Sequence, residues 1–375
     1  MTNTWGVSQT LNTHGFRLFA AAVLAFGFFS LTGANEARAV DATSCTDTSG
    51  YSYTACGGDS AKARTTVIGA ATANAAVSQT VGLISARVSQ FSRTAKAPGG
   101  RAVAAATKGP MVALGTGSAA GDGDNKVGLW ANGSWTRVQG NKSAVQFDGH
   151  IWTAMIGGDY MFTKDFIGGL ALGYENSQYD TAFNNGNTDS NGYTVAPYVI
   201  ARINDTFSVD FNVGYTRVDY DLDRIDPVGN LNKVTGDADS NRWFGALNLN
   251  GDWNVDSVTL GANIGTLYAR EDRGSFTESN TTVVESENID LGRINVGGRA
   301  GYLFEDVFEP YVSALLEYDY ANEKSAYDDR VGVVLGLGFN VFSGEGFSAN
   351  VEGTTTEARS GLDIWSVNAT VRYDF

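Results

Sequence analysis

The sequence predicts an all-β fold, a transmembrane antiparallel β-barrel of about twelve strands preceded by a helix-prone segment. Three observations predict it. From Trp365 to the C-terminus, every second side chain is one that lipid accepts, and polar side chains lie between them. Segments of about ten to sixteen residues with the same two-residue period recur from residue 127 onward. The connections between these segments alternate between short and long, as short periplasmic turns and longer outer loops do in outer-membrane barrels.

The last strand, Leu362 to Phe375, sets the class of barrel. Unpaired backbone groups are not stable in hydrocarbon, so a sheet that spans a membrane has to close on itself. An ordinary amphipathic strand of a soluble sandwich is the alternative interpretation. The strand resembles the closing strand of a bacterial outer-membrane protein, which implies that its outward side chains form the signal read by the outer-membrane assembly machinery. These residues are Trp365, Val367, Ala369, Val371, Tyr373 and Phe375.

Twelve strands are expected between turn residues. Their predicted ranges are 127–138, 150–163, 165–179, 191–204, 206–220, 241–253, 255–270, 288–304, 308–320, 329–340, 346–358 and 362–375. Longer polar loops are expected at 139–148, 180–190, 221–240, 271–287 and 321–328. In the strand 329–340, glycines occupy much of the inner face, which predicts a lumen with little to block it.

The N-terminal region reads as an export signal and a short exported segment. An apolar stretch from Leu18 to Leu31 follows Arg17 and precedes an A-x-A pattern, so residues 1–39 are expected to be a signal peptide cleaved after Ala39. A signal anchor is the alternative. Residues 40–60 contain Cys45 and Cys56, and an even pair of cysteines in an oxidising compartment favours a small disulfide loop over a metal site.

Residues 61–95 are predicted to be helix-prone, because apolar side chains recur there at spacings of three, four or seven. A fully helical segment would be about 50 Å long at 1.5 Å per residue. That exceeds the apolar band of about 25 Å of a barrel, so the helix is long enough to thread a pore. A disordered or weakly helical leader is the alternative. Residues 96–126 form a Gly- and Ala-rich linker, and residues 127–375 form the barrel.

The charges of the chain narrow the function. A formal net charge of −15 excludes nucleic-acid binding by counterion release. Charged residues of both signs fall on the inner faces of the strands, where they avoid the cost of facing lipid, and mixed signs favour a wet channel or a helix-filled pore. The expected lumen-facing charges are Asp159, Glu175, Arg202, Asp210, Arg293, Arg299, Glu317, Arg330, Glu352 and Arg372.

No enzymatic site is expected. After removal of the signal peptide the chain keeps one histidine, His150, and the residue two positions beyond it is Trp152. This removes the His-x-Ser arrangement of outer-membrane phospholipases. A protease dyad would have to combine His150 with Asp148, and a plain loop histidine is the favoured alternative. No metal or other cofactor is expected.

The layout resembles the C-terminal translocator domain of classical (type V) autotransporters. VGLWANGSWTRVQG, GHIWTAMIGGDYMF, IGGLALGYENSQYD and YTVAPYVIARI resemble the early strands of that domain. The resemblance implies that a helix occupies the pore and that the barrel, with the assembly machinery, helps to carry an upstream passenger to the cell surface.

Two features depart from the family pattern. Only about twenty residues separate the cleavage site from the helix-prone segment, so little or no passenger is expected. The segment contains Asn74 but no paired asparagines, so no autoproteolysis is expected. A passive outer-membrane channel or a structural surface protein is the alternative function. The expected partners are outer-membrane lipid, lipopolysaccharide and the assembly machinery, and the barrel is expected to be a monomer.

Overall fold

The computed structural model describes residues 45–46, 52–53, 71–84 and 126–374, apart from residues 143–144, 183, 226–232, 306, 323–326, 328 and 343–346. The expected signal peptide and nearly all of the linker lie outside these residues. β1 (Cys45–Thr46) and β2 (Ser52–Tyr53) form a two-stranded antiparallel sheet. Cys56 lies outside the described residues, so the disulfide stays a prediction.

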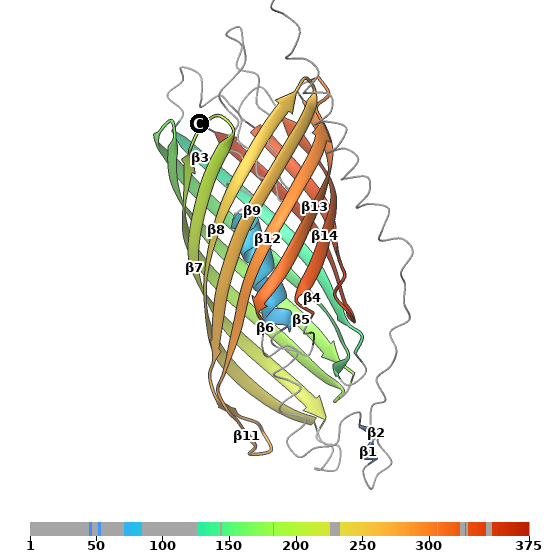
Figure 1. The fold of residues 1–375 in the computed structure, drawn as a ribbon. Coiled ribbons are helices and arrows are strands. Elements are labelled where there is room, and N and C mark those ends of the chain that lie inside the picture. The colour runs from blue at the N-terminus through green and yellow to red at the C-terminus, as the bar shows by residue number, and fades with distance from the viewer. Residues whose placement is uncertain are drawn as a thin grey trace, which may run out of the picture. The chain divides into compact units, whose positions relative to one another are not determined.

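Twelve strands form one closed barrel, which confirms the predicted fold class (Figure 1). Strands pair antiparallel with their neighbours along the chain, and the last strand pairs with the first from Leu362↔Gly140 to Asp374↔Gly128. This closure gives every strand two partners. The strands are β3 (Val127–Gly140), β4 (Phe147–Thr163), β5 (Phe166–Thr181), β6 (Gly186–Arg202), β7 (Phe207–Ile225), β8 (Lys233–Val255), β9 (Val258–Arg273), β12 (Glu287–Tyr302), β13 (Phe308–Ala321), β14 (Val331–Phe342), β15 (Phe347–Glu357) and β16 (Leu362–Asp374).

The connections define two ends of the barrel. We call the end with the longer connections the outer end and the opposite end the periplasmic end. Among the connections whose residues are all described, the one between β9 and β12 is the longest. It contains a hairpin of β10 (Phe276–Thr277) and β11 (Val283–Val284).

Side chains alternate between the outside and the lumen along each strand. In β7, Phe211 and Val213 are 45% and 39% exposed, whereas Asp210 and Asn212 are buried. Exposed aromatic side chains form two rows, one near the periplasmic ends of the strands and one in their outer halves, as the girdles of membrane barrels do. They include Trp152, Tyr160, Phe162, Tyr193, Trp243, Trp253, Tyr302, Phe304, Trp365 and Tyr373. Within the described part of the chain, no helix combines the length and hydropathy needed to cross a bilayer.

Several strands extend further toward the outer end than the sequence predicts. Loops are expected at 180–190 and 221–240, but strand pairing continues through most of both segments, and β8 reaches 23 residues. The loop prediction was therefore wrong there. Beyond the outer row of exposed aromatic side chains, the outward face of the barrel no longer contacts lipid and does not need apolar side chains. The alternation of apolar and polar residues therefore disappears there, although the strand continues. Asp, Asn and Gly are also depleted in strands generally, which makes such segments look like turns.

The glycines of β14 do not leave the lumen open, and that prediction was also wrong. Side chains of neighbouring segments cover them. A Cβ added to Gly338 would lie 2.5 Å from the hydroxyl of Tyr311, and one added to Gly332 would lie 2.6 Å from Nε of Arg359. These glycines provide the space in which large side chains lie flat on the inner wall.

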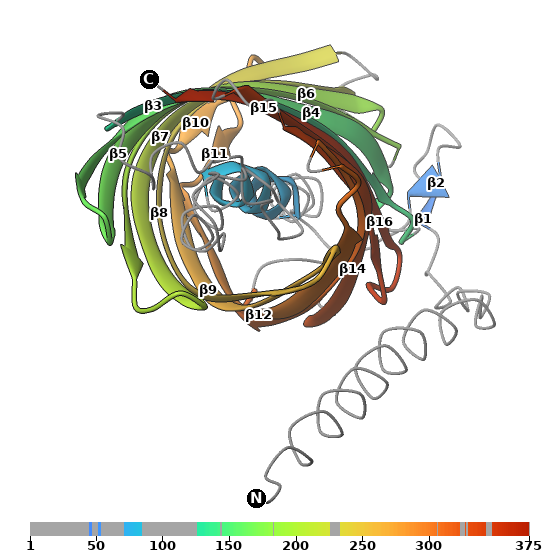
Figure 2. The same ribbon diagram turned by 90° about the horizontal axis from the view of Figure 1, so that it is seen from above.

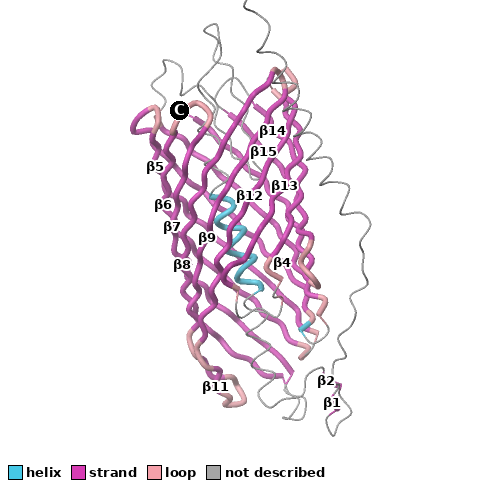
Figure 3. Tube along the Cα trace, in the orientation of Figure 1, coloured by secondary structure: helices cyan, strands magenta, loops and turns pink. Residues whose placement is uncertain are grey.

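A helix over residues 71–84 lies inside the barrel, as Figures 2 and 3 show. Val81 and Ile84 share a buried cluster with Trp130 of β3 and Phe244 of β8. On another wall, Ala73 packs with Ile289 of β12. Contacts with walls on different sides require the helix to be within the pore, which confirms the predicted position. The rest of the predicted helix-prone segment lies outside the described residues.

The N-terminal end of this luminal helix faces the outer end of the barrel. Ala71 belongs to a cluster with Val145 and Tyr327 of the outer connections. At the other end of the helix, the carbonyl of Leu83 accepts a hydrogen bond of 3.2 Å from Asn132 Nδ2, near the periplasmic start of β3. The helix therefore runs from the outer half of the lumen toward the periplasmic half.

Candidate functional site: the helix-filled lumen

The outer half of the lumen contains a network centred on Arg242 of β8. Its guanidinium pairs with Glu175 of β5 at 2.7 Å and with Glu271 of β9 at 2.8 Å, and the three side chains are at most 3% exposed. Tyr220 of β7 donates a hydrogen bond of 2.7 Å to Glu271, and the guanidinium carbon of Arg273 lies 4.6 Å from the centre of the Tyr220 ring. The network joins four strands at one level of the barrel.

A second network lies on the adjacent part of the wall, beginning at β12, which pairs with β9. Arg293 of β12 pairs with Glu317 at 3.0 Å and with Asp319 at 2.5 Å, both on β13. Arg359, from the outer turn between β15 and β16, reaches inward and pairs with the same two carboxylates at 2.9 and 2.8 Å. Two cations and two anions thus alternate, and the set is neutral as a unit.

The periplasmic half of the lumen holds a chain of polar contacts between β3, β6, β4 and β16. Trp130 Nε1 donates to the Tyr198 hydroxyl at 2.8 Å, and that hydroxyl donates to Asp159 Oδ2 at 2.9 Å. Arg372 lies 3.3 Å from the same carboxylate oxygen. A residue of the last strand is therefore tied to β4 across the closing pair of strands.

Three further buried charges lie toward the periplasmic end. Arg299 pairs with Glu309 at 2.8 Å, and its guanidinium carbon lies 3.7 Å from the centre of the Tyr311 ring. Asp210 accepts hydrogen bonds of 2.8 and 2.9 Å from Asn248 and Asn250. Amide donors hold this carboxylate in the wall of the barrel.

The luminal helix carries no charged side chain. It contacts the networks through hydroxyl and amide groups. Ser78 Oγ lies 3.0 Å from Nη1 of Arg293, Asn74 Nδ2 donates to Asn322 Oδ1 at 3.0 Å, and Thr80 Oγ1 lies 3.5 Å from Glu175. The ion pairs of the wall are complete without the helix, so its removal would leave them paired.

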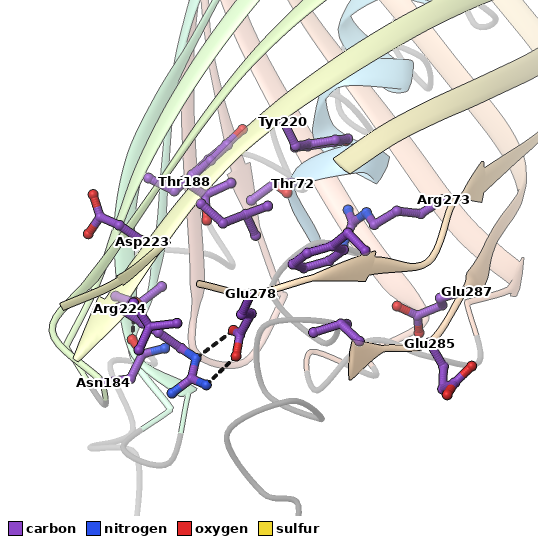
Figure 4. A pocket seen from close by; sticks show the side chains of 16 residues that line it. Thr72, Asn184, Thr188, Tyr220, Asp223, Arg224, Arg273, Glu278, Glu285 and Glu287 are labelled. Atoms are coloured by element: carbon purple, nitrogen blue, oxygen red, sulfur yellow. Dashed lines mark hydrogen bonds and ion pairs between the residues drawn. The ribbon is translucent and has the colours of Figure 1, made fainter. Parts of the chain in front are cut away.

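The β10–β11 hairpin covers part of the outer mouth. Arg224 of β7 donates two hydrogen bonds, of 2.8 and 2.5 Å, to Glu278, and the Ser279 amide donates to the Thr235 carbonyl at 2.8 Å. A pocket of about 820 Å³ lies between this hairpin, strands β6 to β8 and Thr72 of the helix, and Figure 4 shows the Arg224–Glu278 pair at its edge.

Tyr327 closes another part of the outer mouth. Its hydroxyl donates a hydrogen bond of 3.0 Å to the carbonyl of Val145, and its ring packs edge-on against Phe147 at 5.7 Å. Burial raises the pKa of the Tyr327 hydroxyl to about 12. The side chain is therefore neutral over the physiological range of pH.

The helix does not fill the lumen evenly. A cavity of about 140 Å³ remains between the helix and the wall formed by β12 to β16 and β3. Hydroxyl and amide groups line much of it, among them Ser78, Gln79, Thr354, Thr356 and Asn368. The helix packs through apolar side chains on the other wall, so the two sides of the lumen differ in polarity.

Most of the expected lumen-facing charges lie on inward positions of the strands. Arg202 is half-buried, and the buried members are Asp159, Glu175, Asp210, Arg293, Arg299, Glu317, Glu352 and Arg372. Arg330 differs from the expectation, because it precedes β14 and is exposed, outside the buried lining. The alternation extends back to this position, but the strand begins one residue later. The prediction missed Arg242, Glu271, Asp319 and Arg359. The first three alternate with outward-facing residues of their strands, so the two-residue period could have identified them as lumen-facing.

The other predicted residues have these positions. Trp365, Val367, Ala369, Val371 and Tyr373 are exposed on the outward face of β16, and Phe375 lies outside the described residues. Their role as an assembly signal stays a prediction. His150 is on β4 rather than in a loop, and Asp148 pairs with Arg137 at 2.7 Å. Asp148 is thus engaged by a cation, which does not favour a protease dyad.

A closed barrel of twelve strands with lipid-compatible side chains outside, a charged interior and a helix in the pore defines an outer-membrane protein of the helix-plugged class. The family model of the autotransporter β-domain matches residues 129–372, which is more than half of the 375 residues. The chain therefore belongs to the autotransporter β-domain family, and residues 129–372 form a translocator barrel of the outer membrane of Gram-negative bacteria. No curated protein matches the chain in sequence.

Solved autotransporter barrels share the fold. The translocator domain of NalP from Neisseria meningitidis is similar with a TM-score of 0.59 and 15% identity, over 67% of this chain and 89% of that domain. The β-domain of BrkA from Bordetella gives 0.58 and 18%, over 67% and 100%. The transport unit of AIDA-I from Escherichia coli gives 0.50 and 16%, over 68% and 92%.

Proposed function

We propose that the barrel carries the segment N-terminal to its luminal helix across the outer membrane and holds that segment at the cell surface. The direction of the helix carries this proposal. Its first turn lies near Tyr327 at the outer mouth, and its last turn lies near Asn132 on the periplasmic side. A chain that runs in this direction leaves the barrel on the outer side before residue 71. Residues 40–60, with the predicted Cys45–Cys56 loop, are then presented outside the cell.

The barrel acts without an enzymatic step in this proposal. The buried charges that contact the helix are Arg293 and Glu175, and both are engaged in ion pairs with the wall. The assembly machinery is the expected partner, because the outward face of β16 carries the exposed apolar and aromatic side chains of the expected assembly signal, from Trp365 to Tyr373. Lipopolysaccharide surrounds the outer girdle, and the functional unit is one barrel.

Surface labelling and conductance test the proposal. An epitope tag after Ser60 should be accessible to antibody on intact cells, and the purified barrel should conduct more strongly when residues 40–95 are deleted. A tag that becomes accessible only after the outer membrane is permeabilised would contradict the proposal.

A passive channel is the second candidate, and the cavity of about 140 Å³ beside the helix, lined largely by polar residues, favours it. A channel that keeps its N-terminal segment in the periplasm would show an inaccessible tag and the same conductance with and without residues 40–95. The same pair of measurements therefore separates the two candidates.

A further inference from the structure

A groove of about 1180 Å³ lies in the lipid-facing surface across the closing pair of strands. We call it the seam groove. Strand pairing arranges its outward side chains in two rows that cross β16, β3, β4 and β5. One row consists of Val371, Ala131, Ile156 and Leu172, and the row nearer the periplasmic end consists of Tyr373, Leu129, Gly158 and Leu170.

Gly158 and Ala131 make the surface concave. Their neighbours Leu129, Ile156 and Leu170 are 50%, 61% and 47% exposed and form the walls. At Gly157 and Gly158 the barrel carries no side chain on either face. The indole of Trp130 packs behind Gly157 on the luminal side, so it closes the floor of the groove from within.

The length of the concave surface fits one leaflet of the membrane. Small outward residues continue beyond the groove in the next row, where Ala369 pairs with Gly133 and Gly133 with Ala154. The rings of Trp135 and Trp152 end this path. From residue 129 to 135 a strand rises about 20 Å. At a tilt of about 40° this is a depth of about 15 Å, half of the hydrocarbon core of about 30 Å.

Two exposed lysines lie at the periplasmic edge below the groove. Lys126 is exposed next to the start of β3, and Lys164 is exposed in the turn between β4 and β5, where its ammonium lies 3.8 Å from the carboxylate of Asp165. The other described periplasmic turns carry Asp205, Asp256 and Glu305 instead. In the part of the chain that the structure describes, the outward cations of this end are therefore confined to the edge beneath the groove.

We propose that the seam groove binds one acyl chain of an anionic phospholipid from the periplasmic leaflet, with its phosphate beside Lys126 and Lys164. The groove is continuous with the surface that lipid already covers, and its apolar lining accepts hydrocarbon. Lysines at a membrane surface attract anionic headgroups. The bound chain covers β16 and β3, the two strands whose pairing closes the barrel.

Native mass spectrometry of the full mature chain in mild detergent tests this proposal, with phosphatidylglycerol as the probe and phosphatidylcholine of the same chains as the comparison. Gly158→Leu fills the groove, and an added Cβ would meet only the flexible tip of Leu129 at 3.2 Å. Gly245→Leu is the matched control on the outward face of β8, where the nearest atom is 3.6 Å away. Heat-modifiable migration on gels checks that both variants fold.

The affinity for the first phosphatidylglycerol should fall at least fivefold in Gly158→Leu and stay unchanged in Gly245→Leu. Lys126→Gln combined with Lys164→Gln should lower the affinity for phosphatidylglycerol to that for phosphatidylcholine. Equal lipid binding by the wild type and Gly158→Leu would overturn the proposal. Displacement of the phospholipid by lipopolysaccharide at the same site would overturn the choice of ligand. Surface display of residues 40–60 is a separate property and is not expected to change.

Discussion

Replacement of Arg242 by Met removes the cation at the centre of the outer network while keeping a side chain of similar length. Glu175 and Glu271 would both stay buried, at 3% and 2% exposure, and would face each other without the charge between them. Glu271 keeps hydrogen bonds from Tyr220 and Ser240 and an ion pair with Arg273 at 3.8 Å. Glu175 keeps only the contact with Thr80 at 3.5 Å among the contacts described. Loss of one partner from a buried ion pair costs about 3–5 kcal/mol. The ratio of folded to unfolded barrel should therefore fall by about two to four powers of ten.

Urea unfolding of the barrel in lipid vesicles, followed by tryptophan fluorescence, measures this loss. Arg217→Met is the matched control, because Arg217 is 52% exposed and pairs with Asp219 and Asp239 on the outward face. An exposed pair contributes about 0–1 kcal/mol. The double variant Arg242→Met, Glu175→Gln should recover part of the stability, since it removes the buried carboxylate that loses its cation, whereas Glu271 keeps its ion pair with Arg273 at 3.8 Å. A loss below 1 kcal/mol for Arg242→Met, equal to that of Arg217→Met, would refute the reasoning.

Three other changes have expected outcomes. Ile84→Ala truncates a fully buried side chain of the luminal helix, which costs about 2–5 kcal/mol of packing, so single-channel recordings should show more frequent opening than in wild type. The raised pKa of Tyr327 means that its neutral form stabilises the outer mouth. This contribution is present below pH 10 and is lost as the pH rises toward 12, and a Tyr327→Phe barrel should lack that part of the alkaline unfolding curve. Asp221 pairs directly with Asp189 and with Asp237 across three strands, and like charges in such pairs destabilise by up to about 1 kcal/mol. Asp221→Asn should therefore raise the urea midpoint at low salt, and a gain that persists in 1 M salt would contradict an electrostatic origin.

The barrel could be predicted from the sequence because its physical requirement is local. Lipid on one side and polar groups on the other impose a two-residue period on every strand, as in Phe211, Asn212 and Val213. The number of strands and the alternation of short and long connections follow from counting such segments. Outside the membrane the requirement ends, which is why the outer parts of β6, β7 and β8 read as loops.

The charge networks could be predicted only in part. The two-residue period of the strands places Glu175 and Arg242 in the lumen, but it does not show that their side chains form an ion pair. Their strands are separated by β6 and β7, so the pairing depends on the tilt and stagger of the whole barrel. The position of the Arg359 side chain was even harder to predict, because Arg359 lies in a short turn and its side chain reaches inward over Gly332.

The luminal helix is buried on more sides than its sequence pattern predicts. The spacing of Val77, Val81 and Ile84 predicts a narrow apolar stripe, and all three are buried. Ala71, Ala73 and Ala76 are buried as well, because the barrel surrounds the helix. A stripe is expected for a helix that lies on a surface, whereas a helix in a pore is enclosed. Its many small residues are the signal that fits this setting.

The length of β8 determines which molecules meet the outer mouth first. Its 23 residues measure about 78 Å along the strand. At a tilt of about 40° they rise about 60 Å, well over twice the apolar band of about 25 Å. The mouth at β7 and β8 therefore opens well above the lipid headgroups, among the sugars of the cell envelope. Large molecules that approach the cell from outside would meet this rim of aspartates before they meet the membrane.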